Sequence, residues 1–115
     1  MSTLARIEDE WHDEVPIAHL YGEIDASNAD DIDDSLRALV SNRSVALVVD
    51  LSETTYIDSA GINRLFALGE ELRGRQQRLA VVVREGSPIA RMIALTGLDR
   101  TAGAHPTVEA ALASL

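Results

Sequence analysis

The chain of 115 residues has no cysteine, so it has no disulfide framework, no thiol nucleophile and no cysteine-based metal site. It also has no lysine, because all ten of its basic residues are arginine. Aromatic residues make up only 3%, so we expect an aliphatic core. No apolar run approaches the ~20 residues that a membrane-spanning helix needs, and residues 1–11 contain no apolar signal region. We therefore expect a cytoplasmic location.

What the chain does contain is typical of one globular domain spanning residues 1–115. Hydrophobic residues make up 46% and charged residues 25%. A chain of this length buries roughly two-thirds of its unfolded surface, which is enough for a core. Its net charge of −9 argues against a nucleic-acid backbone or an anionic membrane surface as a direct partner.

The stretch from Val45 to Leu72 organises the rest of the chain. It opens with a continuous apolar run at residues 45–49, continues through a polar loop at 51–56, and then places apolar residues at helical spacing from Ile62 onward. This pattern predicts a buried strand, a loop and a helix. Ser59 lies where the helix should begin. Serine is a preferred N-cap residue, because its hydroxyl accepts a hydrogen bond from a free backbone N–H.

Elsewhere, predicted strands alternate with predicted helices. The strands cover residues 4–11, 15–21, 45–49 and 79–83, with a short one near 102–104. The predicted N-caps of the helices are Ser27, Ser59, Ser87 with Pro88 after it, and Thr107, and Gly97 is the predicted left-handed stop of the third helix. The first two strands are expected to form a hairpin. This order predicts an α/β fold with a mostly parallel sheet and about four helices.

Two predicted loops, at residues 22–26 and 51–59, directly follow strands. The carboxyl ends of parallel strands share one edge of a sheet, and α/β proteins place their sites there. We therefore expect Asp25, Asp58 and Ser59 to lie in one neighbourhood.

Three segments resemble the STAS family, named for sulphate transporters and anti-sigma factor antagonists. Residues 50–62, DLSETTYIDSAGI, resemble its signature. Residues 21–25, YGEID, resemble the family's segment before the first helix, and residues 87–98, SPIARMIALTGL, resemble its third helix and stop. The likeness extends from about Val15 to the C-terminus. It implies a single-domain STAS-like fold for residues 1–115.

In anti-sigma factor antagonists of this family, a partner kinase phosphorylates the serine that directly follows the aspartate. That position is Ser59 here, and Ala60 replaces the second serine of many relatives. The resemblance implies that the unphosphorylated protein binds an anti-sigma factor with serine kinase activity and thereby frees a sigma factor. Phosphorylation of Ser59 would inactivate it, and a serine phosphatase would reset it. The implied partner-binding residues are Asp25, Asp58, Ser59 and Gly61.

Several of these residues also have purely structural interpretations. Ser59 could be only a helix cap, Asp58 could bond backbone N–H groups of its loop, and Asp25 could help to cap the first helix. The acidic run Asp30, Asp31, Asp33 and Asp34 lacks the pattern of a calcium-binding loop, so we interpret it as a solvated helical face. Trp11 is interpreted as covering one end of the core, with an exposed contact as the alternative.

Other functions remain to be weighed. STAS domains also serve as scaffold or sensor modules and as accessory subunits of transport systems. A phosphoryl-accepting receiver domain is disfavoured, because such domains need a lysine and the chain has none. An enzyme is disfavoured as well: Ser59 is not in a G-x-S-x-G elbow, the only imidazole bases are His12, His19 and His105, and there is no glycine-rich phosphate loop. We therefore predict a non-enzymatic protein without a cofactor or a metal.

Overall fold

A six-stranded sheet organises residues 5–115, the part of the chain that the computed structural model describes. The strands are β1 (Ala5–His12), β2 (Val15–Ile24), β3 (Ala46–Asp50), β4 (Thr54–Ile57), β5 (Arg78–Val82) and β6 (Gly103–His105). Their order is β1-β2-β3-β5-β6, and β4 pairs with β2 off this path. The hairpin of β1 and β2 is antiparallel and every other pairing is parallel. The predicted hairpin and mostly parallel sheet are confirmed.

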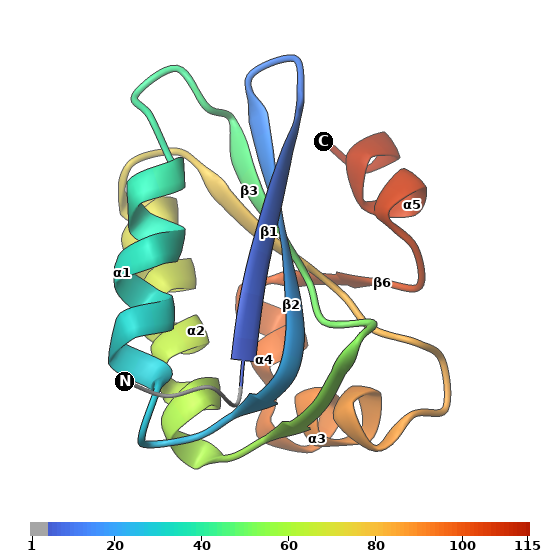
Figure 1. Ribbon diagram of the computed structural model, residues 1–115. Helices are drawn as coiled ribbons and strands as arrows, with labels where there is room; N and C mark the ends of the chain where they lie inside the picture. Colours follow the sequence, from blue (N-terminus) through green and yellow to red (C-terminus); the bar gives the residue numbers. More distant parts are fainter. Residues whose placement is uncertain (1–4) are drawn as a thin grey trace.

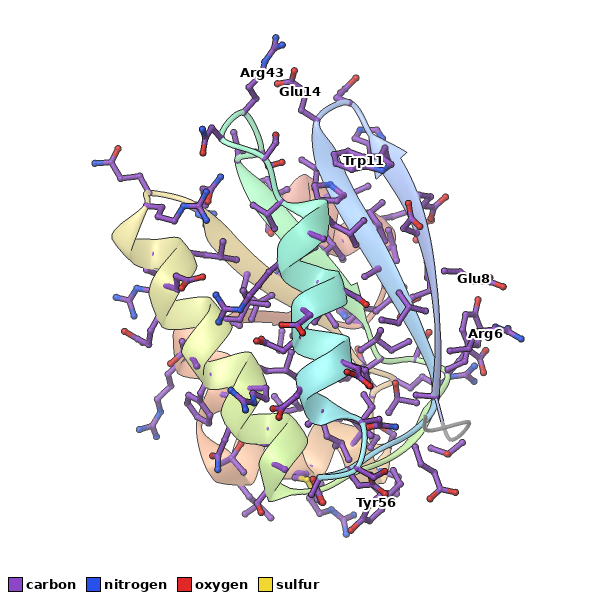
Figure 2. The ribbon with its side chains drawn as sticks, turned by 60° about the vertical axis from the view of Figure 1, so that its left-hand side comes forward. Arg6, Glu8, Trp11, Glu14, Arg43 and Tyr56 are labelled. Carbon is purple, nitrogen blue, oxygen red and sulfur yellow. The ribbon has the colours of Figure 1, made fainter. Side chains whose placement is uncertain are left out.

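Helices cover both faces of this sheet (Figure 1). They are α1 (Ala29–Leu39), α2 (Ser59–Gly74), α3 (Pro88–Thr96), α4 (Leu98–Thr101) and α5 (Val108–Ala113). Figure 2 shows α1 and α2 side by side in front of the sheet, whereas α5 lies on the opposite side. Residues 5–115 form five helices instead of about four, because the single turn α4 follows the left-handed residue Gly97, whose φ is 80°. Within residues 5–115, no helix has both the length and the apolar character to cross a membrane.

The sequence has continuous apolar runs where the central strands lie, and the burial of these strands explains them. All five residues of β3 are buried, because helices cover the strand on both sides. Leu47 and Val49 belong to the larger core beneath α1 and α2, and Ala46 and Val48 belong to the smaller core beneath α5. Both cores are built from aliphatic side chains, as the low aromatic content predicted, and each fully buried Leu or Ile contributes roughly 1.5–3 kcal/mol.

Strand β2 has two different parallel neighbours along its length. Residues 17–19 pair with β3, and residues 22–24 pair with β4. The pairing with β4 contains a register shift between Gly22 and Glu23. Gly22 has a φ of 95°, which favours glycine. The predicted loops at 22–26 and 51–56 are therefore wrong in part, because β2 runs to Ile24 and Thr54–Ile57 form a strand. Both strands end together, and α1 and α2 begin just beyond them.

Both predicted helix starts after residue 80 are confirmed. The Ser87 hydroxyl accepts from the Ala90 N–H at 3.1 Å, and the Thr107 hydroxyl accepts from the Ala110 N–H at 3.0 Å. Of the two interpretations of Trp11, the core one is wrong: the residue is 49% exposed and lies close to the hairpin turn (Figure 2). The reason is its position on the edge strand β1, which packs against the sheet along only one side.

Candidate functional site

Two segments meet at the edge of the sheet where β2 and β4 end. The Asp58 N–H donates to the Ile24 carbonyl at 3.1 Å, and the Ala26 N–H donates to Asp58 Oδ2 at 3.3 Å. The loop that carries Asp25 is thereby tied to the residues that begin α2. The structure thus brings Asp25, Asp58 and Ser59 together, as the order of strands and loops predicted.

The start of α2 corrects the prediction for its N-cap. Asp58, and not Ser59, is the capping residue: its Oδ1 accepts from the Gly61 N–H at 3.1 Å. Aspartate and serine are similarly good N-caps, so the sequence alone did not decide between neighbours. The carboxylate of Asp58 has the further advantage that it faces the positive end of the helix dipole. The structural role suggested for Asp58 is therefore confirmed.

Ser59 is consequently the first helical residue, and its side chain is exposed. Within the part of the chain that the structure describes, its hydroxyl makes no hydrogen bond. It is also followed by Ala60, so no second hydroxyl lies next to it. The hydroxyl of Ser59 therefore lies exposed in the first turn of α2, where a group that approaches from solvent can reach it.

Gly61 determines how closely the start of α2 packs on the ends of β2 and β4. It is buried, and a Cβ atom at this position would lie 2.7 Å from Ile57 Cγ1 and 2.8 Å from Ile24 Cγ2. Real side chains do not approach so closely, so a larger residue would push α2 away from β2 and β4. The absence of a side chain at Gly61 lets the helix start directly on the two strand ends.

The loop before α1 is held by Asp25 and Asn28. Asp25 Oδ1 accepts from the Ser27 N–H at 2.8 Å and from the Ser27 hydroxyl at 2.5 Å. Asn28 is 4% exposed, and its amide donates to the Glu23 carbonyl at 2.8 Å while its Oδ1 accepts from the Asp25 N–H at 3.0 Å. The predicted N-cap Ser27 is wrong, because α1 begins after Asn28. Asp25 orders the loop, and its backbone carbonyl accepts from the Ala29 N–H at 2.8 Å.

Sequence reasoning missed Asn28 and Tyr56. Asn28 stands at the N-cap position of α1, where asparagine is common, but its side chain bonds the preceding loop and makes no cap bond to the helix. Tyr56, in β4, is 48% exposed and lies at the end of the molecule where α2 begins (Figure 2). An exposed tyrosine beside a functional surface is a common anchor for a partner protein. The segment was predicted to be a loop, so the place of Tyr56 on a strand beside the start of α2 was not predicted.

The acidic face of α1 is more engaged than predicted. Asp33 is only 7% exposed, and its Oδ2 accepts from Arg37 Nε at 2.8 Å, while Arg37 also contacts Glu71 of α2. Asp30 contacts Arg64, also of α2. These ion pairs join the two helices, so the interpretation as a solvated face is wrong for Asp33. Among residues 5–115, no group of three or more acidic or histidine side chains is arranged to hold a metal.

The three histidines interact with residues other than Ser59. His19 Nδ1 lies 2.7 Å from Asp50 Oδ2, and His19 Nε2 lies 2.8 Å from Glu10 Oε1. Burial by itself lowers the pKa of His19, but the hydrogen bonds and charges of Glu10 and Asp50 outweigh it and raise the pKa above its ordinary value. His12 lies 3.8 Å from Asp13, and His105 lies 3.3 Å from the Ser114 hydroxyl. His19 thus serves to tie β1 and β3 together across β2.

Comparisons with known proteins agree with this geometry. The model of the family described as Mlab, STAS domain, matches residues 7–109. The anti-sigma-F factor antagonist RsfB of Mycobacterium tuberculosis is 35% identical over 101 residues, which are 88% of this chain and 81% of RsfB. The anti-sigma-B factor antagonist of Listeria monocytogenes is 32% identical over 78 residues, which are 68% of each chain.

A solved structure extends the likeness to three dimensions. The crystal structure of an anti-sigma factor antagonist from Mycobacterium paratuberculosis superposes with a TM-score of 0.85 at 35% identity, covering 96% of this chain and 92% of that one. The family match spans β2 to β6, α1 to α4 and the site at the start of α2. The chain therefore belongs to the STAS domain family.

Proposed function

We propose that this protein is an anti-sigma factor antagonist that is switched by phosphorylation of Ser59. The unphosphorylated form binds an anti-sigma factor with serine kinase activity and so frees a sigma factor. The kinase transfers a phosphoryl group to Ser59, the complex separates, and a serine phosphatase restores the free hydroxyl. The 35% identity to RsfB over most of both chains supports this proposal.

The single observation that carries the proposal is the exposed hydroxyl of Ser59 at the first position of α2. A phosphoacceptor must reach a kinase without unfolding of its own domain. Ser59 meets this condition, because Asp58 performs the capping and leaves the serine hydroxyl without a structural task. A phosphate at this position also faces the positive end of the helix dipole, so the fold tolerates it.

The same position explains how phosphorylation ends binding. A phosphoryl group adds about −1.5 to −2 charges in a close interface. The carboxylates of Asp25 and Asp58 lie on the adjoining loop and on the preceding residue, so they add to the repulsion of any acidic group that faces them. A loss of about 3 kcal/mol in binding free energy weakens affinity more than a hundredfold.

The four predicted partner-binding residues differ in how they take part in this proposal. Ser59 and the partly exposed carboxylates of Asp25 and Asp58 contact the partner directly. Gly61 is buried, so it contributes by holding α2 against the strand ends. We add Tyr56 as an apolar contact beside Ser59.

Affinity capture from an extract of the source cells tests the proposal, with the wild-type protein, Ser59→Ala and Ser59→Asp as baits. The control is Ser35→Asp, which adds the same charge to an exposed position of α1. We expect the wild type, Ser59→Ala and Ser35→Asp to retain an ATP-binding anti-sigma factor, and Ser59→Asp to lose it. ATP should release the factor from the wild type and not from Ser59→Ala.

Two outcomes contradict the proposal. Retention of the same anti-sigma factor by Ser59→Asp would show that charge at this position does not control binding. Retention of one common assembly without a kinase by all four baits would favour the scaffold, sensor or transport-accessory function, with Ser59 reduced to a surface residue.

A further inference from the structure

The ten arginines of the chain differ in whether a carboxylate neutralises them. Six form ion pairs: Arg6, Arg37, Arg43, Arg64, Arg73 and Arg84. Arg75 and Arg78 contact only neutral oxygens, the side-chain amide of Asn42 and the carbonyl of Ser114, each at 3.2 Å. Arg91 and Arg100 have no side-chain partner within residues 5–115. Since 19 acidic residues face 10 arginines, cations left without a carboxylate are unexpected.

Two of these arginines line one hollow together with Arg73. The hollow lies between the end of α2, the start of β5, and α4, and its lining consists of Arg73, Arg78, Leu79, Arg100, Thr101 and Gly103. The carboxylate paired with one of these arginines is that of Glu70, which lies 3.5 Å from Arg73 Nη1. Both of those side chains are more than half exposed, so their mutual attraction is weak. The hollow therefore carries an excess of positive charge in a molecule of net charge −9.

Helix electrostatics account for only part of this cluster. Arg73 is in the last turn of α2, where a cation is stabilised by the helix dipole. Arg78 is the first residue of β5, and its Nη1 donates to the carbonyl of Ser114, the C-cap of α5, so this one bond also belongs to a helix end. Its charge still has no carboxylate partner within residues 5–115. Solubility gives no reason either, because the net charge of the chain is already far from zero.

We propose that this hollow binds a small anion that carries a phosphate group. Guanidinium groups pair with phosphate oxygens through two parallel hydrogen bonds, and arginine is the residue best shaped for this contact. The Thr101 hydroxyl supplies a further donor. Three cations from three elements surround one concavity, which suits a compact, multiply charged group. An extended acidic peptide would instead need its cations in a line.

This site is independent of the proposed function, since it lies at the opposite end of α2 from Ser59. The negative field of the rest of the molecule repels anions. Binding of a phosphate compound to this chain should therefore be confined to the hollow, which makes the test selective.

The test is a titration of the full chain with sodium pyrophosphate and with inorganic phosphate, followed by backbone amide NMR at constant ionic strength. We expect saturable shifts at residues 73, 78 and 100–103 with a Kd for pyrophosphate below about 1 mM, and weaker binding of inorganic phosphate. Arg100→Gln should weaken pyrophosphate binding at least about fivefold, since it removes one charge-assisted contact. Arg91→Gln removes an equally exposed arginine of α3 and should leave the Kd unchanged. The same spectra show whether each variant is folded.

Three results would overturn the proposal: no saturable shift with pyrophosphate, shifts scattered over the surface, or equal affinity in Arg100→Gln and the wild type. A third titration uses a decapeptide of aspartate and glutamate. Binding of this peptide to the hollow without binding of pyrophosphate would reject a phosphate ligand in favour of an acidic protein segment.

Discussion

The two ends of α2 differ in how they use their polar groups. At the N-terminal end, Asp58 accepts from the N–H groups of Gly61 and Ala26, and the Ser59 hydroxyl makes no hydrogen bond within residues 5–115. At the C-terminal end, Arg78 and Arg100 have no carboxylate partner within residues 5–115. The dipole of α2 favours Asp58 at its start and Arg73 in its last turn.

The ends also differ in how tightly they pack. Gly61 leaves no space for even one added carbon, whereas a Cβ atom at Gly74 would have no atom within 4 Å. The position of Ser59 is therefore fixed to the ends of β2 and β4, while the other end of the helix tolerates change. The hydroxyl of Ser59, the proposed phosphoacceptor, thus lies at the more tightly packed end of the helix.

The largest effect on stability is expected from alanine at the two glycines. Gly61→Ala should lower the free energy of unfolding by about 1–3 kcal/mol, because the new methyl group collides with Ile57 and Ile24. Gly74→Ala should raise it by up to about 1 kcal/mol, because glycine is costly in a helix and the space is open. Urea unfolding followed by circular dichroism measures both. Equal stability of Gly61→Ala and the wild type would show that the helix start is not tightly packed.

A smaller effect is expected from the two polar residues at the helix start. Asp58→Ala should lower the free energy of unfolding by about 0.5–2 kcal/mol, the usual loss for a missing N-cap. Ser59→Ala should change it by less than about 0.5 kcal/mol, as an exposed substitution without a hydrogen bond. The same unfolding experiment compares them. If Ser59→Ala proved the more damaging of the two, the assignment of Asp58 as the cap would be wrong.

A further small effect is expected from Arg73, at the C-terminal end of α2. Arg73→Gln should lower the free energy of unfolding by less than about 1 kcal/mol, since it loses an exposed ion pair and a favourable contact with the helix dipole. The difference should shrink as salt is raised, because both terms are screened. Thermal unfolding at low and high salt measures this, and a large, salt-independent loss would mean that Arg73 packs against the protein instead of facing the hollow.

The sequence predicted the architecture well, because periodicity reports which faces are buried. Fully apolar runs indicated central strands such as β3 and β5, and the Ser87-Pro88 and Thr107 starts were confirmed by their hydrogen bonds. The short strand β4 was missed, since four residues with two exposed side chains have no readable period. Its pairing with β2 depends on the tertiary fold.

The site was predicted at the level of its neighbourhood and not of its atoms. The order of strands and loops was enough to place Asp25, Asp58 and Ser59 together. It could not choose between Asp58 and Ser59, or between Ser27 and Asn28, as N-caps, because local preferences for these residues are nearly equal. The choice follows from contacts with distant residues, such as the bond from Ala26 to Asp58. The hollow lined by arginines was not predicted either, since its three arginines come from three separate elements.

The measurement that tests the central claim most directly is the affinity of the phosphorylated and unphosphorylated protein for its anti-sigma factor. In this experiment, the partner identified by capture is incubated with the wild-type chain and ATP. Mass spectrometry then locates the phosphate, and calorimetry measures both dissociation constants. We predict one phosphate, on Ser59, and a loss of affinity of more than about a hundredfold, equivalent to about 3 kcal/mol. Phosphate on another residue, or equal affinity of the two forms, would contradict the account.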